Sequence, residues 1–506
     1  MNALLIYPEF QDTFWSFKHA LKFIRKQATL PPLGLLTVAA LLPSSWSKRL
    51  VDTNVAPLTN ADLAWADIVF LGAMIVQGRS ARAIISRCKN AGLKIVAGGP
   101  LFLDQHAQYQ EVDHFILNEA ELTLPQFLDD LARGQARRLY ASDAFADMHQ
   151  APVPAWELVN RKAYASMSIQ FSRGCPFHCD FCNITTLLGR RVRTKQSAQI
   201  IAELDSLYQL GWRGNIFFVD DNLIGCKRRL RTELLPALIT WRQQHPGITF
   251  NTEASIDLAD DETLLHQMVQ AGFTEVFIGI ETPDEGALVS CGKQQNRARN
   301  LLEDVKRIQR NGLQVQGGFI VGFDTDLPSI FQRQIDFIQK SGIVTAMVGL
   351  LQAPVGTKLY ERLRGEGRIL GHSSGDNADG TTNIIPVMSL ERLMAGYQKI
   401  LRNIYTPEHY YRRIRTFLKE YQPPQAVTRW RCQDLLPFLR AVFHLGIAGQ
   451  ERLHYWKLLI WTYLHRPKLL AVAVTLAVYG RHFHTICQRL QPTPTGEPIL
   501  PSACLR

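Results

Sequence analysis

The chain has 506 residues, of which 46% are apolar and 20% charged, with nine cysteines and a formal net charge of +11. This length predicts two or three domains, and the balance of apolar and charged residues excludes a disordered or fibrous protein. Nine cysteines are too few for a disulfide scaffold, so we expect a reducing compartment.

The first 135 residues alternate short apolar runs with helical patterns. The opening MNALLIYPEF predicts a β-strand and not a secretory signal. Further strands are predicted at residues 50–52, 67–72, 93–97 and 115–117, with helices between them, as at 33–42 and 80–90. This alternation predicts a parallel, doubly wound α/β sheet, which binds ligands outside the carboxyl ends of its strands. The residues at those ends are Pro8, Gly72, Gly98, Gly99 and Glu119.

A second alternating series follows residues 136–160, a predicted linker that contains Pro152 and Pro154. Its strands are predicted at residues 168–172, 215–220, 249–254, 275–281, 314–321 and 345–351, with helices such as 197–210 and 261–271 between them. Six strand–helix units predict a partial (β/α)6 barrel over residues 161–360. Catalytic groups in such barrels gather at the carboxyl ends of the strands.

The last part of the chain, residues 361–506, is predicted to be mostly helical and basic. A polar loop at 371–382 precedes a helix at 389–404, and residues 399–506 hold 16 Lys+Arg against 5 Asp+Glu. The basic and aromatic residues of 455–484 surround an apolar run at 469–479, which is too short to span a bilayer. They favour a surface on anionic lipid, and the alternative is a buried helix of this domain. No RNA-binding module is recognisable, so we expect no nucleic-acid partner.

Three cysteines lie within eight positions, in the stretch Cys175-Pro-Phe-His-Cys179-Asp-Phe-Cys182 after the first strand of the barrel. Soft thiolates at this spacing suit an iron–sulfur cluster. Three ligands leave one iron of a [4Fe–4S] cluster open, and S-adenosylmethionine (SAM) can fill that position. A zinc site completed by His178 or a distant cysteine is the alternative. The remaining cysteines are isolated and are expected to be core or surface thiols: Cys88, Cys226, Cys291, Cys432, Cys487 and Cys504.

The CxxxCxxC pattern, with an aromatic residue before its last cysteine, resembles the radical SAM superfamily. Segments 217–222, 252–255, 279–283, 317–323 and 351–357 fit the same family pattern in order. The resemblance implies that Cys175, Cys179 and Cys182 ligate the cluster. It also implies a set of SAM contacts: Phe181 at the adenosine, Asp220, Asp221, Glu253 and Glu281 at the amine and ribose, and Gly317 and Gly318 at the adenine. The alternatives are that the carboxylates cap helices and that the glycines serve packing.

Residues 30–34, 65–69 and 97–100 resemble the cobalamin-binding domain that precedes many radical SAM domains. The resemblance implies that Pro8, Gly72, Gly98, Gly99 and Glu119 contact cobalamin. The usual cobalamin motif, Asp-x-His-x-x-Gly, is missing, because residues 8–13 read PEFQDT. The nearest histidine, His19, is expected at the surface. A bound cobalamin would therefore lack a histidine ligand. The alternative is a vestigial Rossmann-like domain that binds no cobalamin.

Residues 7–10, 13–17, 72–76 and 179–184, with the helical tail, resemble the group that contains the hopanoid C-2 methylase. This resemblance implies methylation of an unactivated carbon: one SAM methylates cobalamin, and a second yields a 5′-deoxyadenosyl radical that activates the substrate. It also implies a small-molecule or lipid-like substrate such as a hopanoid, and a reductase, flavodoxin or ferredoxin as electron donor. The expected location is the cytoplasm, with contact to the inner face of the membrane.

Three alternatives to this function stay open at the level of sequence. The first is an oxidative cyclase or rearranging enzyme acting on a tetrapyrrole or another small molecule. The second, a methylthiotransferase, is less favoured because the first domain lacks the expected cysteine trio. The third is a non-enzymatic iron–sulfur sensor.

Overall fold

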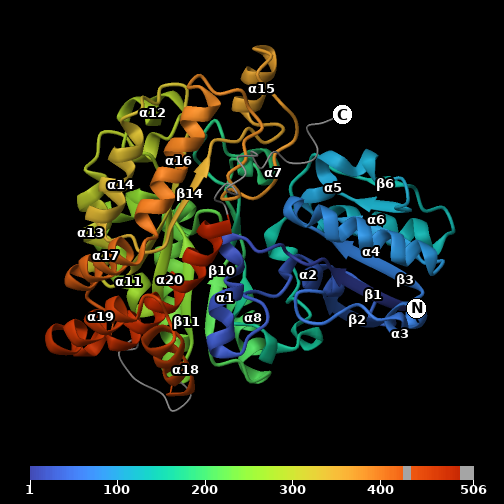
Figure 1. The fold of residues 1–506 in the computed structure, drawn as a ribbon. Coiled ribbons are helices and arrows are strands. Elements are labelled where there is room, and N and C mark those ends of the chain that lie inside the picture. Colours follow the sequence, from blue (N-terminus) through green and yellow to red (C-terminus); the bar gives the residue numbers. More distant parts are fainter. Residues whose placement is uncertain (425–434, 490–506) are drawn as a thin grey trace. The chain divides into compact units, whose positions relative to one another are not determined.

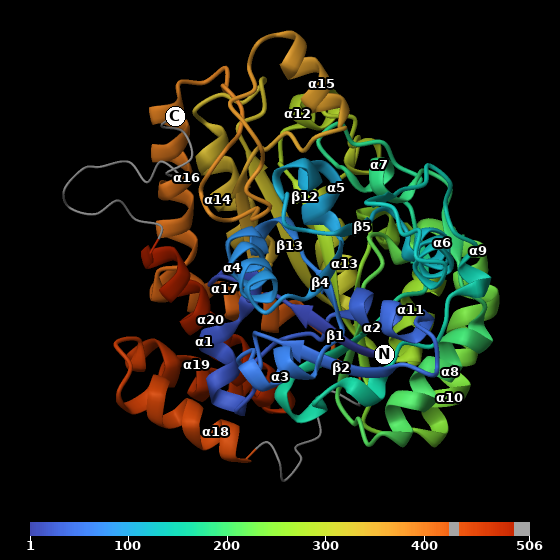
Figure 2. The same ribbon diagram turned by 90° about the vertical axis from the view of Figure 1, so that its right-hand side faces the viewer.

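The computed structural model describes residues 1–424 and 435–489 (Figures 1 and 2). The chain forms two compact units that are interleaved along the sequence. Unit 1 comprises Met1–Gln11, Lys26–Gly174 and Leu187–Val219, and unit 2 comprises Asp12–Arg25, Cys175–Thr186 and Asp220–Arg506. The predicted domain boundaries at residues 135, 160 and 360 follow chain order instead, and they remain predictions.

Unit 1 contains a six-stranded parallel sheet with the strand order β2-β1-β3-β4-β5-β6. Its strands are β1 (Asn2–Tyr7), β2 (Ser47–Asp52), β3 (Ile68–Gly72), β4 (Lys94–Gly98), β5 (His114–Ile116) and β6 (Leu139–Tyr140). Five of them match predicted strands, whereas β6 lies in the predicted linker. Because β2 and β3 flank β1 on opposite sides, the strand order reverses at β1, which is where doubly wound sheets bind ligands.

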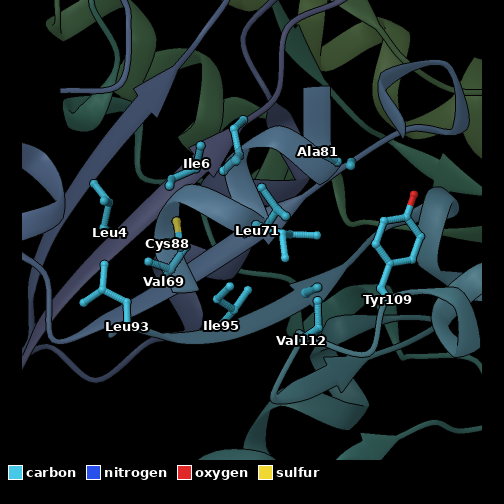
Figure 3. Close-up of a cluster of buried hydrophobic side chains, with 14 of the residues drawn as sticks. Leu4, Ile6, Val69, Leu71, Ala81, Cys88, Leu93, Ile95, Tyr109 and Val112 are labelled. Carbon is cyan, nitrogen blue, oxygen red and sulfur yellow. The ribbon is translucent and has the colours of Figure 1, made fainter. Parts of the chain in front are cut away.

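Helices cover both faces of this sheet (Figure 1). One face packs on α3 (Asn60–Trp65), α4 (Gly78–Asn90) and α5 (Pro100–Gln105), and the other on α2 (Leu33–Leu41) and α6 (Ala120–Ala132). Strand β1 supplies both cores, because Leu4 and Ile6 point to one face and Ala3 and Leu5 to the other. Figure 3 shows the first core, with Cys88 among its apolar side chains. Burial raises the pKa of Cys88 to about 11, so it is the core thiol that was predicted.

Six strands in the middle of the chain match the six predicted for the barrel. Unit 1 holds β7 (Ser166–Ile169), parallel to β10 (Asn215–Phe218), the helix α8 (Ser197–Gln209), and the antiparallel pair β8 (Ser172–Arg173) and β9 (Arg193–Thr194). Unit 2 holds four parallel strands, paired in chain order: β11 (Thr249–Glu253), β12 (Phe273–Glu281), β13 (Gln314–Val321) and β14 (Ala346–Leu350). The helices of this part of unit 2 include α10 (Leu235–Gln244), α11 (Glu262–Ala271), α12 (Glu285–Ser290), α13 (Leu301–Arg310), α14 (Ile330–Ser341) and α15 (Lys358–Gly365).

The end of the described chain is helical, as predicted. Its helices are α16 (Leu390–Ile404), α17 (Pro407–Glu420), α18 (Leu435–Ala441), the π-helix η14 (Val442–Ile447), α19 (Arg452–His465) and α20 (Leu470–Arg489). Helix α20 contacts α17, α19 and the short helix α1 (Lys18–Leu21), which Figure 1 shows in blue beside the red α20. The loop predicted at 371–382 contains neither helix nor strand.

The apolar run at 469–479, within the segment predicted to lie on lipid, belongs to the core of unit 2. Within it Ala473, Leu476 and Ala477 are buried, and so is Leu469 at its start. In the part of the chain that the structure describes, Pro467–Arg489 is the one helix long and apolar enough to cross a membrane, and 56% of its apolar window is buried inside the protein. For this run the structure therefore bears out the buried-helix alternative.

Candidate functional site

The three predicted cluster cysteines lie on one loop of unit 2, ahead of α7 (Ile184–Leu188). The Cys182 amide donates to the Cys179 carbonyl at 3.1 Å, which closes a turn between these two cysteines. Asp180 anchors the loop on both sides, because its amide donates to the Cys291 carbonyl and its own carbonyl accepts from the Leu359 amide, both at 2.9 Å. These two hydrogen bonds fix the loop to the segments around Cys291 and Leu359.

Burial raises the pKa of all three thiols, and that of Cys182 reaches about 12. Three polar groups oppose this effect. The side chain of Asn222 hydrogen-bonds to Cys175, the Gln295 Nε2 donates to the Cys179 Sγ at 3.7 Å, and the Lys293 ammonium lowers the pKa of each thiol. Thiolate ligands here need further positive charge, which the irons of a cluster supply.

Lys293 was not predicted, and it forms the central ion pair of the site. Its Nζ lies 2.6 Å from the Glu281 Oε1, and the two side chains are only 12% and 8% exposed. Burial lowers the pKa of the Lys293 ammonium, but the charges of Glu281 and Cys179 outweigh it and raise the pKa overall. Gly279 leaves room for the pair, since a Cβ at this position would lie 2.8 Å from the Lys293 Nζ.

The end of β12 is strained in a way that directs Glu281 toward Lys293. The register of β12 against β13 shifts between Gly279 and Glu281, and Glu281 adopts a left-handed φ of 63°. The Asn296 Nδ2 donates to the Gly279 and Ile280 carbonyls, both at 3.0 Å, and the Gln334 Nε2 donates to the Ile320 carbonyl at 2.7 Å and to the Glu281 carbonyl at 3.3 Å. These amides stabilise a backbone conformation that is costly in isolation, as is common at functional sites.

Three further predicted residues, Asp220, Asp221 and Glu253, form a group of neighbouring carboxylates. Burial and the charges of Asp221 and Asp220 raise the pKa of Glu253 to about 8, and burial raises that of Asp221 to about 6. Asn222, Ser255 and Asp284 occupy the N-cap positions of the following helices, so none of the predicted carboxylates stands at such a position. Crowded carboxylates of this kind favour a cationic ligand, which restores their ionised form.

The structure surrounds Phe181, Gly317 and Gly318 with apolar side chains. The Phe181 ring meets Phe323 edge-on, with ring centroids 6.1 Å apart, at the border of an apolar cluster. A Cβ on Gly317 would lie 2.9 Å from the Phe319 ring, and one on Gly318 would lie 2.8 Å from the Phe277 ring. Packing thus accounts for both glycines, and their contact with adenine stays a prediction.

The donor set fits a cubane cluster better than a single ion. Within residues 1–424 and 435–489, no three His, Cys, Asp or Glu side chains converge as the ligands of one metal ion would. A zinc site needs that convergence, whereas each cysteine of a cubane binds a separate iron. Cys291 lies near the loop, but its Sγ is buried in the apolar cluster and directed at the Leu288 carbonyl, 3.7 Å away. Cys432 and Cys504 lie outside the described residues.

At the strand ends of unit 1, the residues predicted to contact cobalamin also form hydrogen bonds and close packing contacts within the protein. The Pro8 carbonyl accepts hydrogen bonds from the side chains of Gln77 and Asn54. Gly99 has a φ of 97°, and a Cβ there would lie 2.8 Å from the Ala73 carbonyl oxygen. A Cβ on Gly98 would lie 2.7 Å from the Ile116 carbonyl oxygen, and one on Gly72 would lie 2.9 Å from the Leu35 Cγ. The sheet order fits a ligand at β1, but residues 8–13 offer no histidine to it.

Glu119 is the centre of a buried ion-pair network in unit 1. Its two oxygens accept from Arg193 at 2.6 and 2.9 Å, from Arg173 at 3.1 Å and from the Ala146 amide at 2.9 Å. Arg173 also pairs with Glu121 at 2.7 Å. These partners occupy Glu119 within the protein, and a contact with cobalamin stays a prediction.

His19 belongs to unit 2, and its side chain is 17% exposed, so it reaches the surface only in part. Its Nε2 lies 3.5 Å from Asp12, and its ring lies 5.6 Å from that of His482. Burial lowers the pKa of His19 despite the nearby carboxylate.

Comparison with known proteins adds three kinds of likeness. Residues 169–338 match the radical SAM superfamily, and residues 357–494 match a domain of unknown function, DUF4070. An uncharacterized methyltransferase of Synechocystis sp. (strain PCC 6803) is 40% identical over 492 residues, which cover 96% of this chain and 91% of that protein. The hopanoid C-2 methylase of Rhodopseudomonas palustris (strain TIE-1) is 33% identical over 471 residues, covering 90% and 88%.

A solved structure shares the fold. It is that of OxsB, a cobalamin-dependent SAM radical enzyme, with aqua-cobalamin and SAM bound. It aligns with 97% of this chain and 79% of its own, with a TM-score of 0.61 and 14% identity.

Proposed function

Because the chain belongs to the radical SAM superfamily, in the group that includes the hopanoid C-2 methylase, we propose that it methylates an unactivated carbon of a lipid-like substrate such as a hopanoid. It is a radical SAM enzyme with methyltransferase relatives, so a [4Fe–4S] cluster and SAM are its cofactors. Cobalamin is the proposed third cofactor, in keeping with the fold shared with OxsB.

The observation that carries this proposal is a loop with three cysteines beside the buried Lys293–Glu281 pair. When bound, the cluster supplies the electron that cleaves SAM, and cobalamin supplies the methyl group. Cys175, Cys179 and Cys182 would hold the cluster, and the Lys293 ammonium would offset the charge of their thiolates. Glu281, Glu253 and Asp221 would accept hydrogen bonds from the amine and ribose of SAM.

In unit 1, cobalamin would lie at the carboxyl ends of β1 and β3, near Pro8, Gly72, Gly98 and Gly99. Residues 8–13 contain no histidine, so this loop would offer a bound cobalamin no imidazole. Visible absorption of the purified protein after incubation with cobalamin tests whether a corrinoid binds. Protein that binds no corrinoid at all would support the alternative of a Rossmann-like domain without cobalamin.

The proposed partners follow from this chemistry. A reductase, flavodoxin or ferredoxin would deliver the electron, and a lipid-like substrate would bring the enzyme to the inner face of the cytoplasmic membrane. The basic character of residues 399–506 supports such a contact.

The decisive test is expression of the chain in a hopanoid-producing host that lacks C-2 methylation. We expect hopanoids heavier by one methylene unit, and a trideuterated label when the host is fed methyl-labelled methionine. A Cys179→Ala variant expressed to the same level is the matched control and should give no product. Loss of hydrogens from the substrate would point to the cyclase instead, and absence of 5′-deoxyadenosine in a reduced mixture with SAM would point to a sensor.

A further inference from the structure

Unit 2 exposes large apolar side chains on α18, η14 and α19, within the segment that matches the domain of unknown function. Ten of them are 41–68% exposed, and together they are called here the apolar face: Leu435, Leu436, Leu439, Phe443, Ile447, Leu453, Trp456, Ile460, Tyr463 and Leu464. Scattered single apolar residues are normal on a protein surface, but a contiguous set of this size marks a site of interaction.

The spacing of these residues places them on one side of each helix. Successive members from Leu435 to Ile447 are one, three, four and four residues apart, and those from Leu453 to Leu464 are three, four, three and one apart. The opposite side of α19, with Tyr455, Leu458 and Leu459, is buried and holds the helix on the core. The exposed side is therefore not needed for folding of the helical region.

The two stripes adjoin. Helix α19 contacts η14, and the Trp456 Nε1 donates to the Gly446 carbonyl at 2.9 Å (Figure 2 shows α18 and α19 next to each other). The stripe on α19 therefore meets η14 at Trp456, and η14 continues directly from α18.

Within the described residues 435–468, the exposed charged side chains beside the apolar face are basic. Between residues 435 and 468 the one acidic residue is Glu451, which is buried and lies 3.8 Å from Arg481. Arg452, Lys457 and Lys468 are exposed at the rim. This charge pattern is complementary to a negatively charged surface and would repel a basic partner.

We infer that the apolar face docks on the surface of an anionic lipid bilayer. Leucine, isoleucine and phenylalanine side chains would enter the acyl boundary, Trp456 and Tyr463 would lie at the level of the headgroups, and the three cations would contact anionic headgroups. Docking of this kind lies in the plane of the membrane, in agreement with the buried state of α20. The inference rests on the proposed function for its purpose, delivery of a lipid-like substrate, but binding itself requires neither cluster nor SAM.

Flotation of the full chain with vesicles tests the inference. We expect binding to vesicles of phosphatidylglycerol and phosphatidylethanolamine, and much weaker binding to phosphatidylcholine alone. An Ile460→Asp, Leu464→Asp double variant should lose at least tenfold in affinity. Val387→Asp is the matched control, because Val387 is an equally exposed apolar residue (65%) outside the apolar face, and it should bind like the unmodified protein.

A second pair of substitutions tests the charges without touching apolar packing. Lys457→Gln and Lys468→Gln should each lower the affinity for anionic vesicles about fivefold at low salt. Circular dichroism and melting temperature should match those of the unmodified chain for every variant, because each replaced side chain is exposed.

Two outcomes overturn the inference. One is a full chain that ignores anionic vesicles and forms a dimer that the double variant dissociates, since the apolar face is then a contact between copies. The other is vesicle binding that the double variant retains. Because flotation involves no catalysis, a failed methylation assay leaves the docking result standing, and failed docking leaves the methylation assay unaffected.

Discussion

Replacing Glu119 by glutamine tests whether this carboxylate holds unit 1 together. Glu119 lies between Arg193 and Arg173, and the three side chains are only 5%, 15% and 14% exposed. Glutamine keeps the shape but removes the charge, so Arg193 loses its carboxylate partner and Arg173 keeps only that of Glu121. Breaking a buried ion pair costs about 3–5 kcal/mol. At about 2–4 °C per kcal/mol for a unit of this size, the melting temperature should fall by about 6–20 °C.

Calorimetry of the full chain without cofactors measures this effect in the absence of any ligand. Glu111→Gln is the matched control, because it removes the same charge from an exposed position in unit 1 and should stay within about 0.5 kcal/mol of the unmodified protein. If Glu119→Gln melts like this control while corrinoid affinity falls, Glu119 is a ligand contact and the reasoning from the network is wrong.

Three further predictions concern the two units. Lys293→Met should lower the free energy of unfolding by about 3–5 kcal/mol, because Glu281 then stays buried without its partner. An unchanged midpoint of urea unfolding would contradict this. Burial and Asp221 raise the pKa of Glu253 from 4.5 to about 8, so its proton is held more tightly in the folded state. The melting temperature of the cofactor-free protein should therefore fall as the pH rises from 4.5 to about 8. The fall should be smaller in Glu253→Gln, and a melting temperature that rises with pH in both proteins would refute this prediction. Gly99→Ala should cost about 1–3 kcal/mol in urea unfolding, since φ is 97°, and an unshifted midpoint would argue against strain there.

The fold was predictable where burial imposes a pattern over several residues. Strand β1 is buried on both faces, so its apolar run is visible in the sequence, and β13 (Gln314–Val321) has the predicted bounds. Strand β6 has two residues, Leu139 and Tyr140, which is too short for any periodicity to be detected. It was therefore assigned to a linker.

The predicted family membership is confirmed, and it rested on residues close together in the sequence. The cysteine loop is such a segment, whereas Lys293 meets Glu281 only because the chain turns through α12, twelve residues later. Asn222, which bonds to Cys175, was within a segment noted for its aspartates, yet its own role was missed.

The segment 455–484, which was predicted to lie on lipid, is divided between two helices of different exposure. Its apolar run at 469–479 is buried in α20, whereas Trp456, Ile460, Tyr463 and Leu464 are exposed on α19. Which helix faces solvent is decided by packing between helices, which no single segment reveals.

Electron paramagnetic resonance detects a cluster that is held by three cysteines and has an iron free to bind SAM. Anaerobically reconstituted and reduced protein should show a [4Fe–4S]⁺ signal that changes shape when SAM is added, and Cys179→Ala should lack this signal. A full chain without a four-iron signal, or with one that SAM leaves unchanged, would show that these cysteines hold no such cluster.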